Sequence, residues 1–219
     1  MERVLEPEVM DTVEEADSYE AMDHSEPNQA FLGRLVELGA HGRMLDIGTG
    51  PGHLPVLVCE HFADAEVVGI DLARKMLVHA EKRRVGSAVA GRIELKVMDA
   101  KDLAFEEASF DAVFSNTILH HIPDPIPFLR GAWRVLKPGG VLLIRDLFRP
   151  KSPERVAELV ALHAGEEAPY AQELFRASLC AAFTPGELEE LAREAGVVGA
   201  EVAVDTDRHM SLQASARTY

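Results

Sequence analysis

Three glycines at every second position mark the stretch of this chain best suited to binding chemistry. From Leu45 to Gly52 the sequence reads LDIGTGPG. Glycine tolerates left-handed backbone and lets a ligand approach the bare main chain. A helix expected to begin at about His53 would direct its unpaired N–H groups toward that ligand. Asp46 would either brace this loop or join the hydrogen-bond network of the ligand. The stretch therefore predicts a nucleotide-like ligand above a strand–loop–helix turn.

Polar residues recur where the next three predicted strands end. A carboxylate at Asp71 can accept hydrogen bonds from both hydroxyls of a ribose. An acid at Asp99 can meet the exocyclic amine of a base, and Asn116 follows the fourth strand. Ligands of open parallel sheets bind outside the carboxyl ends of the strands, so these residues should share one crevice. His53 stands where a dinucleotide fingerprint requires its third glycine, which disfavours a nicotinamide dehydrogenase.

Five motifs in this order make the chain resemble the class I S-adenosylmethionine-dependent methyltransferases that act on small molecules. They lie at 45–52, 69–71, 98–100, 110–116 and 136–140. The resemblance implies S-adenosyl-L-methionine as cofactor and S-adenosyl-L-homocysteine as product. It places the glycine loop against the methionine part, Asp71 at the ribose, Asp99 and Ala100 at the adenine, and Asn116 beside the amino-acid end or the reacting centre. The expected cofactor residues are Asp46, Gly48, Thr49, Gly50, Gly52, Asp71, Leu72, Met76, Asp99, Ala100, Asn116 and Tyr19.

The catalytic groups follow less directly from the sequence. Methyl transfer from a sulfonium is an in-line displacement whose leaving group needs no proton, so the protein mainly positions the acceptor and excludes water. A general base is required only for a weak nucleophile. The candidate catalytic residues are His120, His121, Asp146 and His209, and at least one of the two adjacent histidines is expected to be structural. The candidate acceptor-binding residues are Arg145, Arg149, Tyr170 and Arg208.

Alternative roles remain open for several of these side chains. Paired arginines near a crevice can hold a carboxylate or phosphate. An ion pair within its own loop is the competing role for Arg149. A solvated turn is the competing role for Arg208 and His209.

Short apolar runs alternate with helical patterns along the chain, which indicates a parallel sheet covered on both faces. The predicted strands are Arg43–Ile47, Glu66–Ile70, Ile93–Met98, Phe110–Ser115, Gly140–Arg145, Val197–Val204 and His209–Ala216. The predicted helices start at Ser25 and then cover His53–His61, Arg74–Arg84, Ala100–Leu103, Asp124–Val135 and Glu187–Ala195, with a long helical segment over Ser152–Ala182. Residues 137–140 predict a turn that leads into the fifth strand.

The fold class expected is α/β. It is a Rossmann-like, seven-stranded, mostly parallel sheet with helices on both faces, a C-terminal antiparallel hairpin and a helical lid. One methyltransferase domain is expected over 1–219. It divides into an N-terminal tail and cap helix (1–39), a cofactor-binding core (40–150), a lid insertion (151–183), and a last helix with the hairpin (184–219).

The composition of the chain disfavours a nucleic acid, a membrane and a metal ion as binding partners. The 219 residues carry a net charge of −15, which disfavours a nucleic-acid backbone, and the apolar runs are too short to span a bilayer. Two cysteines offer neither a disulfide framework nor a metal-type spacing, so no metal is expected, and the N-terminus lacks the pattern of a signal peptide.

We therefore expect a cytoplasmic methyltransferase with a small-molecule acceptor, and the sequence leaves its oligomeric state open. Two alternatives are an enzyme that uses the same cofactor for another reaction, and a non-catalytic regulatory protein of the same fold.

Overall fold

A computed structural model describes residues 1–6, 11, 12, 14, 20 and 25–215. Tyr19, which the resemblance places over the cofactor, lies outside these described residues.

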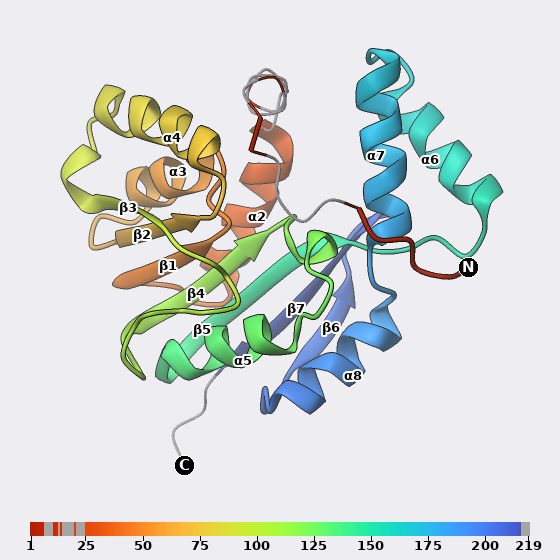
Figure 1. The fold of residues 1–219 in the computed structure, drawn as a ribbon. Helices are drawn as coiled ribbons and strands as arrows, with labels where there is room; N and C mark the ends of the chain where they lie inside the picture. Colours follow the sequence, from red (N-terminus) through yellow and green to blue (C-terminus); the bar gives the residue numbers. More distant parts are fainter. Residues whose placement is uncertain (7–10, 13, 15–19, 21–24, 216–219) are drawn as a thin grey trace.

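A seven-stranded sheet in the order β3-β2-β1-β4-β5-β7-β6 forms the centre of the molecule (Figure 1). Strands β1 to β5 run parallel, whereas β7 is antiparallel to both β5 and β6. This arrangement confirms the predicted mostly parallel sheet with a C-terminal hairpin. The strands are β1 (Arg43–Ile47), β2 (Glu66–Asp71), β3 (Ile93–Val97), β4 (Phe110–Asn116), β5 (Leu136–Leu147), β6 (Glu201–Val204) and β7 (His209–Ser215).

Helices cover both faces of this sheet (Figure 1). Helices α2 (Ser25–Glu37), α3 (His53–His61) and α4 (Arg74–Gly86) form one layer, and α5 (Ile126–Val135) and α8 (Pro185–Ala195) form the other. The sequence dictates this three-layer arrangement because consecutive strand residues point to opposite faces of the sheet, and both faces carry apolar side chains that need a covering layer of helices. Met44 packs in the core under α2 and α3, whereas Leu45 packs in the core under α5 and α8.

Two further helices extend beyond the end of β5. Helices α6 (Pro153–Ala164) and α7 (Pro169–Ala181) pack together around a small core of their own that includes Leu159 and Leu179. They replace the continuous helical segment expected from the sequence. Among the described residues, none of the helices combines the length and apolar character needed to cross a membrane.

Three predicted elements differ from the structure. Residues 100–103 form a turn instead of a helix. Strand β5 begins at Leu136, so the residues predicted to form a turn belong to the strand. The strand accommodates them because its register with β4 shifts between Phe110 and Ala112 and because Gly139 has a positive φ of 82°. The hairpin's first strand begins at Glu201 and not Val197, because the Val197 N–H closes the end of α8 on the carbonyl of Ala192.

Candidate active site

The glycine loop lies between the end of β1 and the start of α3 and is held by its own backbone. Gly48, Gly50 and Gly52 all have positive φ, at 76°, 53° and 79°. The N–H groups of Gly48 and Thr49 both donate to the carbonyl of Ile70, at 2.8 and 2.9 Å. The loop is therefore anchored to the neighbouring strand β2.

The carboxylate of Asp71 holds the other side of this loop. One of its oxygens accepts the Gly50 N–H at 2.8 Å, and the other accepts the Ala73 N–H at 2.8 Å. Burial raises the pKa of this carboxyl, and the backbone N–H donors partly offset that shift. Asp71 thus joins the glycine loop to the beginning of α4.

Asp46 is buried beneath the loop. Its Oδ2 accepts a hydrogen bond from the Thr49 hydroxyl at 2.7 Å, so it braces the loop through a side chain. Its Oδ1 is buried and has no hydrogen-bond partner among the described residues. Burial raises the pKa of Asp46 to about 7, despite the Thr49 hydrogen bond. One buried acceptor is therefore left for a donor that these residues do not supply.

A cavity opens at the carboxyl ends of β1, β2, β3 and β4, and we call it the strand-end cavity. It encloses about 1050 Å³ of empty space, including its open mouth. Of the predicted site residues, it brings together Gly48, Thr49, Gly50, Asp71, Leu72, Met76, Asp99, Ala100, Asn116 and His121. Asp46 and Gly52 are not among the described lining residues.

The candidate catalytic residues do not gather in that cavity. His121 lines it, but His120, Asp146 and His209 are not among the described lining residues. His120 and Asp146 are each 2% exposed and pair with one another, Nδ1 to Oδ1, at 2.6 Å. Burial acts against both charges, yet the pairing raises the pKa of His120 and lowers that of Asp146.

His209 lies in the hairpin, opposite Leu147 in the register of β5 and β7. Burial, aided by Arg145 and Arg208, lowers its pKa to about 3. The ring is therefore neutral, and it is not among the described residues that line the strand-end cavity.

Two of the four expected acceptor-binding residues are used inside the protein. Arg149 donates to the carbonyls of Met1 (3.0 Å) and Ala182 (2.8 Å) and pairs with Glu187 at 2.6 Å. Arg145 donates to the carbonyl of Pro27 and pairs with Asp205. These bonds hold both arginines within the fold, and neither is among the described residues that line the strand-end cavity.

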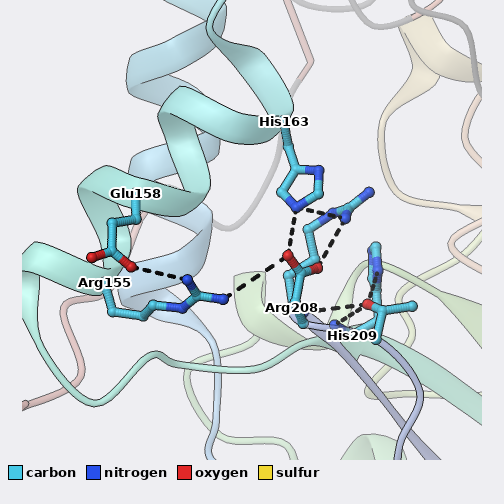
Figure 2. Close-up of polar contacts among 7 residues, drawn as sticks. Arg155, Glu158, His163, Arg208 and His209 are labelled. Carbon is cyan, nitrogen blue, oxygen red and sulfur yellow. Dashed lines mark hydrogen bonds and ion pairs between the residues drawn. The ribbon is translucent and has the colours of Figure 1, made fainter.

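The other two expected acceptor-binding residues lie on the surface. Tyr170 is 52% exposed in the first turn of α7. Arg208 lies next to His163 of α6, as Figure 2 shows, with 3.0 Å between Nη1 of Arg208 and Nε2 of His163. His163 also contacts Asp207 at 2.8 Å, so this cluster ties α6 to the hairpin turn.

Several residues that line the strand-end cavity were not predicted from the sequence as site residues. They include Asn28, His53, Met98, Lys101, Thr117, Ile118 and Ile122. Asn28 could have been found, because it stands with Phe31, Leu32 and Leu35 at helical spacing on the buried stripe of α2. A polar residue in such a stripe indicates a contact other than core packing. Thr117 has a positive φ of 63°, which the sequence does not reveal.

Comparison with known proteins places this arrangement in a family. Residues 45–144 match the family model described as a methyltransferase domain. The 27-O-demethylrifamycin SV methyltransferase of Amycolatopsis mediterranei (strain S699) is 36% identical over 135 residues, which cover 58% of this chain and 49% of that protein. The demethylmenaquinone methyltransferase of Roseiflexus castenholzii (strain DSM 13941 / HLO8) is 32% identical over 167 residues, covering 71% of this chain and 67% of the relative.

A solved structure adds a ligand-bound example. Phosphoethanolamine N-methyltransferase 2 of Haemonchus contortus, in complex with phosphomonomethylethanolamine and S-adenosylhomocysteine, aligns with a TM-score of 0.62 at 29% identity. The alignment covers 82% of this chain and 38% of that one. The chain spans about half the length of several curated relatives that it matches. By its matched domain, its relatives and its sheet, the chain belongs to the class I S-adenosylmethionine-dependent methyltransferases.

Proposed function

We propose that this protein transfers a methyl group from S-adenosylmethionine to a small-molecule acceptor. The observation that supports this most strongly is the convergence of the glycine loop, Asp71, Asp99 and Asn116 on the strand-end cavity. These groups come from the ends of adjacent parallel strands, where ligands of such sheets bind.

The chain's own groups suit the chemistry of this cofactor. At Gly50 the position of a Cβ atom has no atom of the described residues within 4 Å, so the loop offers bare backbone to a ligand. The unpartnered Oδ1 of Asp46 suits a charged donor such as an ammonium, directly or through water. We assign the methionine part to this loop, the ribose to Asp71, and the adenine to Asp99 and Ala100.

When bound, the cofactor supplies a methyl group already activated by its sulfonium. The protein then has to align the acceptor and exclude water. Asn116, Thr117 and His121 contribute the polar wall next to the glycine loop, and Ile118 and Ile122 contribute apolar surface. The buried pair of His120 with Asp146 positions this wall, because the Asp146 carboxylate also accepts the His120 backbone N–H at 3.1 Å.

The charge of the chain supports a small molecule as the methyl acceptor. A chain with 37 acidic and 22 basic residues suits a small acceptor better than a nucleic acid. Both cysteines are free thiols, which fits a reducing cytoplasm. We treat 1–219 as a single methyltransferase domain whose segments at 1–39, 40–150, 151–183 and 184–219 serve one site.

Calorimetric titration with S-adenosylmethionine tests the proposal. Asp71→Asn keeps the size of the side chain but weakens its hold on the ribose and on the Gly50 N–H. We expect this variant to bind at least about tenfold more weakly, the loss of one charge-assisted hydrogen bond.

Asp111→Asn is the matched control. Asp111 stands at the other end of β4, where it pairs with Lys137 at 2.9 Å and accepts the Arg43 N–H. Its loss should leave cofactor binding unchanged. Wild-type protein that binds no S-adenosylmethionine, or equal binding by Asp71→Asn and wild type, would overturn the proposal. Mass spectrometry of acceptor mixtures then tests the reaction itself, since the product gains one methyl group.

A further inference from the structure

Three side chains of metal-ligand type meet beside the strand-end cavity. They are Glu6 from the N-terminal segment and His120 and His121 from the short helical turn η2 (Leu119–His121). Nε2 of His120 and Nδ1 of His121 each lie 3.3 Å from Oε1 of Glu6. All three atoms lie within 4.8 Å of one another.

The cluster is withdrawn from solvent, and one of its atoms is unsatisfied. The side chains of Glu6, His120 and His121 are 8%, 2% and 18% exposed. Oε1 of Glu6 is buried and accepts no hydrogen bond from the described residues. Because a buried carboxylate oxygen is costly without a partner, this atom is suited to a positive group between it and the two rings.

Asp146 prepares His120 for such a role. Its Oδ1 lies 2.6 Å from Nδ1 of His120, so that nitrogen carries a proton and donates it. In the neutral ring the lone pair of Nε2 is then directed toward Glu6, and a bound metal ion would displace the second proton that the raised pKa of His120 favours. Metal-binding histidines are commonly held by a carboxylate in this way.

The distances favour a metal ion over a shared proton. A protonated imidazole donating to a carboxylate brings nitrogen and oxygen to about 2.7–2.9 Å. Two ligand atoms bound about 2.0–2.2 Å from a tetrahedral ion lie about 3.3–3.6 Å apart. Both separations from Oε1 of Glu6 are 3.3 Å. They match the spacing of metal ligands and exceed that of a charged hydrogen bond.

We propose that Glu6, His120 and His121 bind a first-row divalent transition metal such as Zn²⁺, with Asp146 supporting His120. Two imidazoles and one carboxylate suit Zn²⁺, whereas Mg²⁺ and Ca²⁺ prefer oxygen ligands. Three protein ligands leave a position for water or another small ligand. The sequence predicted no metal because Glu6 is far from the histidines along the chain.

The ion would fasten the N-terminal segment to the cavity wall. Arg3 already donates to the carbonyls of His120 and Ile122, at 3.0 Å each, and Val4 donates to the carbonyl of Cys180 in α7. His121 and Ile122 line the strand-end cavity. Metal occupancy therefore fixes the conformation of this part of the wall.

Zn²⁺ binding to the full chain, stripped with chelator and free of cofactor and acceptor, tests the site. We expect calorimetry and elemental analysis to give one Zn²⁺ per chain. Co²⁺ in its place should give the visible absorption of a tetrahedral site. Glu6→Gln and His121→Asn should each weaken Zn²⁺ binding by at least about tenfold. His121→Asn affects a partly exposed side chain, so it keeps the test valid if the Glu6 variant unfolds.

His163→Gln is the matched control. His163 also faces a carboxylate, that of Asp207 at 2.8 Å, and Figure 2 shows it next to Arg208, whose positive charge repels a metal ion. This variant should bind Zn²⁺ as the wild type does. A wild-type chain that binds no Zn²⁺, or folded Glu6 and His121 variants that bind it equally well, would overturn the proposal. Because the titration contains no S-adenosylmethionine, its outcome is independent of methyl transfer.

Discussion

Nδ1 of His120 lies 2.6 Å from Oδ1 of Asp146, and both side chains are 2% exposed. This buried pair joins β5 to η2, the turn that leads into the cavity wall. Asp146 Oδ1 also accepts the backbone N–H of Leu147, and its Oδ2 accepts that of His120. One carboxylate therefore satisfies three donors from two elements.

Replacing Asp146 with Asn should destabilise the fold strongly. Breaking a buried pair from one side leaves the other partner uncompensated, at a cost of about 3–5 kcal/mol. Urea unfolding of the variant and the wild type measures this difference. Glu158→Gln is the control, because its pair with Arg155, drawn in Figure 2, is exposed and should contribute less than about 1 kcal/mol. Similar losses for the two variants would contradict the role of the buried pair.

Gly48→Ala and Gly50→Ala should act on different properties, although both glycines have positive φ. A Cβ atom at Gly48 would come within 2.5 Å of Cγ2 of Ile118, whereas one at Gly50 would enter open space. We expect Gly48→Ala to lose roughly 2–4 kcal/mol of unfolding free energy from strain and overlap.

Gly50→Ala should lose only about 1–2 kcal/mol, from its backbone conformation. Its methyl group would occupy the cavity, so S-adenosylmethionine should bind at least about tenfold more weakly. Thermal unfolding and calorimetry of the two variants separate these effects. Normal cofactor binding by folded Gly50→Ala would contradict the assignment of the loop.

Asp46 should make the fold less stable as the pH rises. Burial raises its pKa to about 7 from an ordinary value of 3.8, so the folded state holds a proton that the unfolded state has lost. The stabilisation is complete below about pH 4 and disappears as the pH rises through 7, with a slope of at most about 1.4 kcal/mol per pH unit. Relative to wild type, Asp46→Asn should become more stable between pH 4 and 7. Parallel stability curves would argue against the raised pKa.

His209 should have the opposite pH dependence. Its pKa falls to about 3 from 6.5 mainly because it is buried, so the folded state resists protonation. Its contribution is complete above about pH 6.5 and is lost progressively as the pH falls toward 3. His209→Asn should therefore gain stability relative to wild type below pH 6.5. Urea unfolding at intervals from pH 4.5 to 8 measures the stability of the variant and of the wild type. A difference between them that stays constant across this range would contradict the lowered pKa of His209.

Local sequence determined the strands, most helices and the cofactor loop. Apolar runs interrupted by glycine at 48, 50 and 52 specify a strand that turns into a helix, because glycine alone adopts that backbone without strain. Asp71, Asp99 and Asn116 could be assigned to one crevice from sequence, since parallel strands bring their carboxyl ends to the same edge.

Only the tertiary structure decided which partners the charged residues outside the glycine loop contact. Arg149 bonds Met1, Ala182 and Glu187, and Glu6 meets His120, through contacts between segments far apart in the sequence. Neither periodicity nor local spacing encodes such contacts, because they depend on how whole elements pack. The sequence alone thus determined which polar residues gather at the strand-end cavity, and packing determined which other polar side chains are engaged inside the fold.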